Sequence, residues 1–225
     1  LTSGKIIQGP PVADHAMALL LALTRRLLWS VRGVAPPDMP RPTDLSGKTA
    51  VIYGLGGIGS CIADRARGFG MKIKAVTETN MPILSFVDKL HYDEELEDIL
   101  PEADVVFISA PLTPLTYKRF NAKILGCMRN EAYLINVSRG EIIDSDDLEK
   151  AIDKGRFAGV GLDVTDPEPL PDSHPILLAE RVLVTPHYAG TTTSHERRFD
   201  LITTNIRRFL SDRPLVNKID NILGY

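Results

Sequence analysis

A glycine-rich turn at residues 54–59 constrains the fold of this chain more than any other feature. Gly54, Gly56 and Gly59 form the pattern GxGxxG between the apolar run KTAVIY and the helical pattern IGSCIADRARGFG. Glycines at this spacing permit a tight turn, close approach of a pyrophosphate and close packing of helix on strand. The N-terminus of the following helix offers free N–H groups to phosphates. The pattern predicts a dinucleotide site; the alternative is a turn that only packs tightly.

Strand and helix patterns alternate along the rest of the chain. Further strands are predicted for the stretches MKIKAV, ADVVFISA, AYLINVS, AGVGLDV and RVLVTPH. Because these strands are apolar on both faces, they indicate a parallel sheet covered by helices on each side. We therefore expect an α/β fold with a Rossmann-type, doubly wound parallel sheet.

Four further local features accompany this pattern. Pro10 and Pro11 precede VADHAMALLLALTRRLLW, and proline suits the first turn of a helix, so we place the helix start there. This apolar helix is predicted to lie in the core or in a subunit interface. Residues 31–47, with four prolines, predict an extended connector. Ser145 is predicted to cap the helix SDDLEKAIDKG, which we expect to end before Gly155.

Composition excludes several classes of protein. The 225 residues are 44% hydrophobic, carry a formal net charge of −3 and have no basic stripe, which argues against a nucleic-acid partner. The longest apolar run, residues 16–23, is shorter than the roughly 20 residues of a membrane span. Cys61 and Cys127 have no metal-ligand spacing and form no disulfide framework. We expect a soluble, cytoplasmic protein without a metal site.

Three chemically active residues each follow a predicted strand. Arg139 lies in INVSRG, Glu168 in DVTDPEPLP and His187 in VTPHYAG. In an open parallel sheet, ligands bind at the carboxyl ends of the strands. Arginine can bind a carboxylate through two hydrogen bonds, and histidine can transfer a proton near neutral pH. Singly, each residue has a plainer interpretation, such as an Arg139–Asp144 ion pair; together they predict a catalytic site.

Other residues leave alternatives open. Glu78 lies nineteen residues after Gly59, where dinucleotide-binding folds use a carboxylate to hold the ribose hydroxyls. It could equally be a solvated carboxylate in a turn. No arginine follows it to bind a 2′-phosphate, which favours NAD over NADP as the cofactor, with NADP possible. The remaining histidines are interpreted as structural or surface residues: His15, His91, His174 and His195.

Several of these stretches together resemble the D-isomer-specific 2-hydroxyacid dehydrogenases over nearly the whole chain. The stretches are VADHAMALLLAL, GLGGIG with FGMKIKAV, ADVVFISAPLTPLT, INVSRG, DVTDPEPLP and TPHYAG. The DPEPLP loop and HPILLAERVLVTPHYAG are most similar to glyoxylate/hydroxypyruvate reductases of that family. The resemblance implies an N-terminal substrate domain that is largely missing from this sequence. It also implies an NAD(P)-binding domain over residues 1–190, with a hinge and dimerisation helix at 10–30, and a C-terminal helix over 191–225 that returns toward the substrate domain.

The resemblance also implies an activity and roles for individual residues. A hydride would pass between NAD(P)H and a small 2-keto acid or D-2-hydroxy acid, in a homodimer. His187 would protonate the keto oxygen, Glu168 would hold His187, and Arg139 would clamp the substrate carboxylate. Asp163 would lie near the nicotinamide carboxamide, and Thr77 occupies the ribose-binding position of many members. The full cofactor set is Gly54, Gly56, Gly57, Ile58, Gly59, Thr77, Glu78, Ala110, Pro111, Val137, Ser138, Arg139, Asp163, His187 and Gly190.

Two other functions remain as alternatives. One is an NAD(H)-binding regulatory protein, since relatives of this fold serve as transcriptional corepressors. The other is a non-catalytic fragment that binds NAD without turnover.

Overall fold

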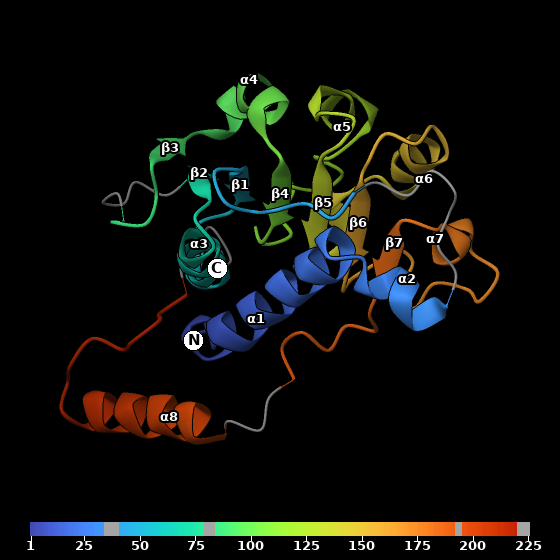
Figure 1. The fold of residues 1–225 in the computed structure, drawn as a ribbon. Helices are drawn as coiled ribbons and strands as arrows, with labels where there is room; N and C mark the ends of the chain where they lie inside the picture. Colours follow the sequence, from blue (N-terminus) through green and yellow to red (C-terminus); the bar gives the residue numbers. More distant parts are fainter. Residues whose placement is uncertain (34–40, 79–83, 192–194, 220–225) are drawn as a thin grey trace.

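A parallel β-sheet forms the centre of the molecule. A computed structural model describes residues 1–33, 41–78, 84–191 and 195–219. Within these residues, seven strands pair in parallel in the order β3-β2-β1-β4-β5-β6-β7, as Figure 1 shows. The strands are β1 (Thr49–Tyr53), β2 (Lys72–Val76), β3 (Lys89–His91), β4 (Val105–Ile108), β5 (Tyr133–Asn136), β6 (Gly159–Leu162) and β7 (Val182–Val184). The doubly wound Rossmann-type fold is confirmed, and the strand order reverses between β1 and β4.

Helices cover both faces of the sheet (Figure 1). On one face, α1 (Lys5–Thr24) and α3 (Gly57–Gly68) pack over the sheet in one apolar core cluster. On the other, α4 (Leu96–Ile99), α5 (Ala122–Cys127) and α6 (Ser145–Asp153) pack in a second cluster. The remaining elements are α2 (Leu27–Arg32), α7 (Pro175–Leu178), α8 (His195–Leu210) and the 3-10 helices η1 (Asp93–Glu95), η2 (Leu100–Glu102) and η3 (Gly140–Ile142).

Strand β3 is absent from the sequence-based expectation. It has only three residues, Lys89–His91, and pairs with β2 through His91 and Val76. A short strand at a sheet edge, with a lysine at its start, has no apolar run to mark it. Its pairing with β2 depends on the tertiary structure.

The predicted start of α1 at Pro10 and Pro11 is wrong, because the helix begins at Lys5 and contains both prolines. The residue before a proline normally avoids helical geometry, since its Cβ clashes with the proline ring. Gly9 has no Cβ, which relieves part of this clash. A Cβ on Gly9 would also lie 2.8 Å from the carbonyl oxygen of Gly57. Gly9 therefore allows both the helical path and the close crossing of α1 over α3. Within this chain, α1 is a core helix.

Predictions about two other helix ends are also corrected. The N-cap of α6 is Asp144, whose side chain accepts the N–H of Asp147 at 3.3 Å, and Ser145 is the first helical residue. Gly155 follows the helix with a φ of 65°, as expected. The helical pattern IGSCIADRARGFG extends past the end of α3, which stops at Gly68, and Phe69 after it is 44% exposed. The predicted connector at 31–47 lies partly outside the described residues.

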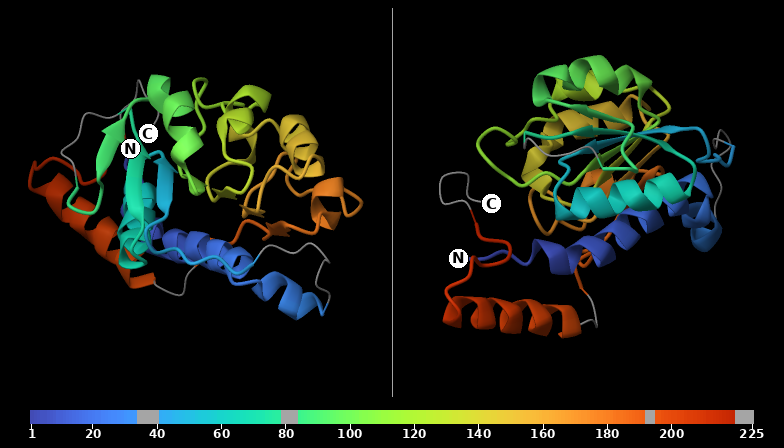
Figure 2. Two further views of the ribbon diagram at one scale, coloured as in Figure 1. Left: turned by 45° about the horizontal axis from the view of Figure 1, so that its top comes forward. Right: turned by 90° about the vertical axis from the view of Figure 1, so that its left-hand side faces the viewer.

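Helix α8 lies on the side of α1 that faces away from the sheet (Figures 1 and 2). A groove of about 570 Å³ separates it from residues 2–7, and its lining is mostly apolar. Several large apolar side chains of this helix are exposed: Phe199, Ile202, Ile206, Phe209 and Leu210. Nearby, Thr2 pairs with Lys218 in an isolated antiparallel bridge. None of the helices in the described part of the chain combines the length and apolar character needed to cross a membrane.

Candidate active site

The glycine turn lies where the strand order reverses, between β1 and α3. Gly54 has a φ of 97°, and a Cβ there would lie 2.4 Å from the backbone nitrogen of Ala110. A Cβ on Gly59 would lie 2.0 Å from the carbonyl oxygen of Gly54. By contrast, a Cβ on Gly56 would have no atom of the described residues within 4 Å. Two glycines are therefore required by packing, while the third borders open space that suits a pyrophosphate.

The remaining predicted cofactor residues of this region line the same strand ends. Gly57 is the first residue of α3, and Ile58 packs against the core. Ala110, Val137 and Ser138 are buried just beyond β4 and β5, whereas Pro111 is exposed. The Ser138 hydroxyl donates to the carbonyl of Ala110, so the ends of these two strands are tied together.

Glu78 lies just past the carboxyl end of β2, at the predicted ribose position. Its Oε1 accepts the backbone N–H of Asp93 at 3.1 Å, although the residue is exposed. The neighbouring Thr77 is buried, and its N–H donates to the carbonyl of His91 at 3.0 Å. One oxygen of Glu78 is thus fixed, and a carboxylate has the capacity to accept further hydrogen bonds. The residue fits the ribose hydroxyls of a dinucleotide.

Glu168 and His187 are in direct contact. The Nδ1 of His187 lies 2.5 Å from Oε1 of Glu168, and the side chains are 44% and 40% exposed, respectively. The two residues come from the loops that follow β6 and β7. His187 has a φ of 51°, an uncommon backbone conformation for a residue with a Cβ. Because Nδ1 is bound to the carboxylate, Nε2 is the nitrogen that faces other partners.

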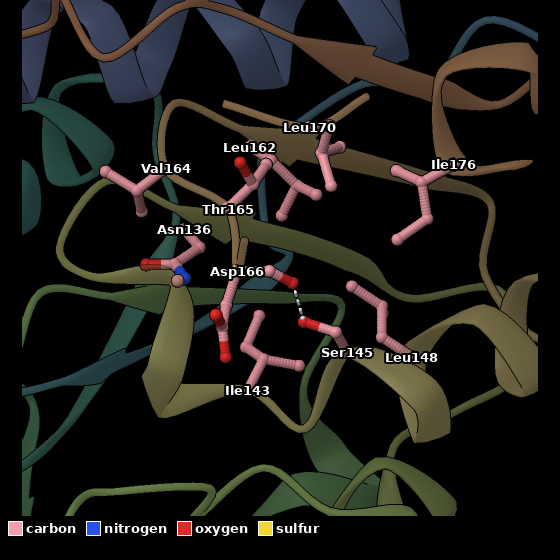
Figure 3. A pocket seen from close by; sticks show the side chains of 11 residues that line it. Asn136, Ile143, Ser145, Leu148, Leu162, Val164, Thr165, Asp166, Leu170 and Ile176 are labelled. Atoms are coloured by element: carbon pink, nitrogen blue, oxygen red, sulfur yellow. Dashed lines mark hydrogen bonds between the residues drawn. The ribbon is translucent and has the colours of Figure 1, made fainter. Parts of the chain in front are cut away.

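The loop that carries Glu168 is held by α6 and η3. Figure 3 shows that the hydroxyl of Ser145 donates to the carbonyl of Asp166, at 2.6 Å. A Cβ on Gly140 would lie 2.1 Å from the carbonyl of Thr165, so η3 packs directly on this loop. The cavity in Figure 3 measures about 10 Å³ and is lined mainly by apolar side chains. It has room for one water molecule at most, so it is not a substrate pocket.

Arg139 directly precedes Gly140, the residue that packs against the loop carrying Glu168. It lies past the carboxyl end of β5, and its side chain is exposed. Its carbonyl accepts from the side chain of Asn136 at 2.9 Å, and its Nη1 donates to the carbonyl of Ser138 at 2.6 Å. Asp144, the alternative partner, pairs instead with Lys118 at 3.1 Å. Arg139 therefore lies past the carboxyl end of β5, which pairs with β6, and Glu168 follows β6 in the chain.

Asp163 faces the interior and holds the loop that carries His187. The residue is 2% exposed, and Oδ1 accepts from Thr185 Oγ1 at 2.6 Å and from the N–H of Tyr188 at 3.2 Å. Its Oδ2 accepts the N–H of Ala189 at 2.9 Å. Burial raises the pKa of this carboxyl, but hydrogen bonds from His15, Thr185 and Ala189 outweigh burial and leave its pKa below the ordinary value. Asp163 thus fixes the backbone of the loop that carries His187.

His15 is a partner of Asp163 that the sequence did not reveal. Its Nε2 lies 2.9 Å from Thr185 Oγ1 and 3.3 Å from Asp163 Oδ1. Its ring also meets Tyr188 edge-on, at 5.2 Å between centroids. A Cβ on Gly190, the last predicted cofactor residue, would lie 3.4 Å from the side chain of Gln8 on the same helix. Helix α1 therefore packs against the loop that carries His187 and holds it in place. No local signal in the sequence links residues so far apart.

The fold and the glycine turn define a Rossmann-type dinucleotide-binding domain. The protein-family model described as D-isomer specific 2-hydroxyacid dehydrogenase, NAD binding domain, matches residues 17–189 of this chain. The chain belongs to this family.

Named relatives support the same assignment. The chain is 36% identical to a glyoxylate reductase of Thermococcus gammatolerans and 34% identical to one of Thermofilum pendens, over 92% of its length in each case. It spans 66% and 65% of those two proteins, just under two thirds of their length. It also superposes on a D-isomer specific 2-hydroxyacid dehydrogenase of Xanthobacter autotrophicus in complex with NADPH and MES. That match has a TM-score of 0.86 and 28% identity, and covers 100% of this chain and 92% of the other.

Proposed function

We propose that this chain carries the catalytic half of an NAD(P)-dependent reductase of small 2-keto acids. The observation that carries the proposal is the contact between Glu168 and His187. It lies past the carboxyl ends of β6 and β7, on the side of the parallel sheet where β1 leads into the glycine turn and where ligands bind. Arg139, on the neighbouring strand, provides the cation that a keto acid requires. The bound nicotinamide would supply or accept the hydride.

Each of the three residues has a distinct task in this proposal. His187 donates a proton from Nε2 to the keto oxygen of the substrate as the hydride arrives. Glu168, bound to Nδ1, fixes the orientation of the ring, so that Nε2 faces the substrate. Arg139 binds the substrate carboxylate, because a guanidinium presents paired N–H groups to the two oxygens. In the reverse direction, His187 accepts the proton from the hydroxyl group.

The cofactor preference follows from Glu78. A carboxylate accepts hydrogen bonds from the two ribose hydroxyls of NAD and repels the 2′-phosphate of NADP. We therefore propose NAD as the preferred cofactor. Because a relative in the same family was crystallised with NADPH, the preference requires direct measurement.

Substrate class and organisation are further parts of the proposal. The names of the two relatives support glyoxylate, and the family supports other small keto acids such as hydroxypyruvate. We propose that residues 1–190 form the dinucleotide-binding unit and that residues 191–225 serve a substrate-binding lobe. The exposed apolar face of α8 supports this assignment, because a contiguous exposed apolar patch is typical of a surface that contacts another protein unit. The family resemblance supports a cytoplasmic homodimer joined through α1.

A spectrophotometric assay of the natural gene product tests the proposal. Glyoxylate, hydroxypyruvate and a panel of longer 2-keto acids are each added with NADH or NADPH, and the cofactor absorbance is followed. Oxidation of the cofactor by a small keto acid is expected. Cofactor binding without turnover on any keto acid would contradict the enzymatic proposal and favour an NAD(H)-sensing protein.

A further inference from the structure

A second group of residues, separate from the Glu168–His187 pair, is linked to Glu78 through Asp93. Asp93, in η1, donates its backbone N–H to Glu78. The side chain of Asp93 is bound at both oxygens: Tyr53 donates its hydroxyl to Oδ1 at 2.8 Å, and Arg119 donates Nε to Oδ2 at 2.8 Å. Arg119 also donates Nη2 to the carbonyl of Asp93 at 3.2 Å. Asp93, whose N–H binds Glu78, is therefore itself held through three acceptor atoms: Oδ1, Oδ2 and its carbonyl oxygen.

The three residues come from three different parts of the fold. Tyr53 is the last residue of β1, directly before Gly54, and it is 4% exposed. Its ring packs edge-on against Phe120, with 5.1 Å between centroids. Burial and the Asp93 carboxylate raise the pKa of Tyr53 far above its ordinary value, so the hydroxyl keeps its proton and remains a donor. The carboxyl end of β1 thus leads into the glycine turn and also provides the tyrosine that holds Asp93.

The guanidinium of Arg119 is bound to Asp93. A free arginine at this edge would be expected to bind a 2′-phosphate and favour NADP. Here Asp93 occupies its Nε and one Nη donor and balances its charge. The Arg119–Asp93 pair leaves the Glu78 carboxylate as the dominant charge at the ribose position.

We propose that Tyr53, Asp93 and Arg119 are positioning residues, which hold the Glu78 carboxylate ready for the ribose hydroxyls and thereby set the preference for NADH over NADPH. This inference rests on the proposed dinucleotide-dependent function. The physical basis is preorganisation: a side chain that is already fixed loses less conformational entropy when the ligand binds. Neither Tyr53 nor Arg119 needs to touch the cofactor for this effect.

Calorimetric titration of the protein with NADH and with NADPH tests the proposal without relying on turnover. Tyr53→Phe removes one hydrogen bond to Asp93 and is expected to weaken NADH binding by about 3- to 10-fold, with a smaller effect on NADPH. The matched control is Tyr133→Phe, because Tyr133 is also a buried strand tyrosine whose hydroxyl makes one side-chain contact, to Thr43 at 3.3 Å. The control is expected to leave both affinities unchanged.

The sign of the Arg119→Gln effect separates positioning from direct phosphate binding. Loss of the Asp93 contact is expected to lower the discrimination against NADPH, as in Tyr53→Phe. A selective loss of NADPH affinity would instead make Arg119 a phosphate ligand and overturn the proposal. Arg129→Gln is the matched control, since Arg129 also pairs with a carboxylate, Asp104, at 2.8 Å.

A double-mutant cycle tests whether Tyr53 acts through Glu78. In a Glu78→Ala background, Tyr53→Phe is expected to have no further effect on the ratio of the two affinities, because the positioned group is gone. An undiminished effect would overturn the proposal and make Tyr53 a structural residue. The two proposals fail separately: a wild-type protein that binds neither nucleotide refutes the proposed function. If the wild-type protein prefers NADH and all these variants keep that preference, only the positioning inference is refuted.

Discussion

The backbone carbonyl of Asp163 accepts the N–H of His187 at 2.9 Å, and the carboxylate of the same residue binds the next two amides. One residue at the end of β6 therefore holds three successive N–H groups of the loop after β7. This arrangement stabilises the positive φ of His187 and presents its ring to Glu168. The geometry of the proposed acid is thus set by a buried carboxylate that stays inside the fold.

The first prediction concerns Asp163→Asn. An amide keeps one acceptor oxygen but replaces the other with a donor, which faces backbone N–H groups. We expect a loss of about 1–3 kcal/mol in the free energy of unfolding, as for other buried charged hydrogen bonds. Turnover should fall because the His187 loop loses its geometry, while NADH affinity changes little. Urea unfolding, steady-state kinetics and calorimetric titration measure the three effects.

Asp104→Asn is the matched control for this substitution. Asp104 accepts the N–H of Thr49 at 2.8 Å and pairs with Arg129, at the amino-terminal ends of the strands, opposite the candidate site. It should lower stability without changing the turnover of the remaining folded protein. If Asp163→Asn weakened NADH binding more than it slowed turnover, Asp163 would act on the nicotinamide instead.

The second prediction is a pH dependence of stability. The pKa of Asp163 is lower in the folded chain than its ordinary value, so the charged form stabilises the fold. This contribution is complete above the unfolded pKa of about 3.9 and is lost as the pH falls through the lower folded value. The urea midpoint of the wild type should therefore decline in acid more steeply than that of Asp163→Asn. Equal slopes below about pH 4 would contradict the assignment.

The third prediction concerns His187→Gln. Removal of a general acid is expected to lower kcat by about 100- to 10,000-fold, while the Kd for NADH stays within the range of the wild type. His174→Asn is the control, because His174 lies at the N-terminus of α7, where its Nδ1 accepts the N–H of Ile176. Parallel losses of turnover and cofactor affinity would make His187 a structural residue.

The fourth prediction concerns Arg139→Lys. An ammonium group keeps the charge but cannot make two parallel hydrogen bonds to a carboxylate. The KM for the keto acid should rise by about tenfold, the cost of one charge-assisted hydrogen bond. Arg156→Lys should leave KM unchanged, because Arg156 donates to the backbone carbonyls of Gly126 and Met128. An unaltered KM in Arg139→Lys would remove Arg139 from the carboxylate role.

The fifth prediction separates two glycines of the same turn. In Gly56→Ala the methyl group points into open space, so the protein should fold with nearly unchanged stability but bind NADH weakly. In Gly59→Ala the methyl group would meet the carbonyl of Gly54 at 2.0 Å, so folding itself should suffer. Thermal unfolding and NADH titration of both variants check the contrast. Normal NADH affinity in Gly56→Ala would place the pyrophosphate elsewhere.

Patterns that are local in the chain were sufficient for the architecture. The unalternating strands and the glycine turn predicted a parallel, doubly wound sheet, because a strand that is apolar on both faces must be covered on both. The same reasoning placed Arg139, Glu168 and His187 at the ends of neighbouring strands. It did not find β3, whose three residues form a strand only because β2 lies beside them.

Long-range contacts required the tertiary structure. His15 reaches Thr185 and Asp163 across the fold, and Tyr53, Asp93 and Arg119 converge from three separate segments. Their types and spacing in the sequence carry no signal, because each partner is chosen by where the sheet and the helices bring the backbone. The sequence alone thus determined which layers form and which chemical groups follow the strands at their carboxyl ends. Only the folded chain decided which side chains hold those groups in place, since hydrogen bonds depend on distances that sequence separation does not define.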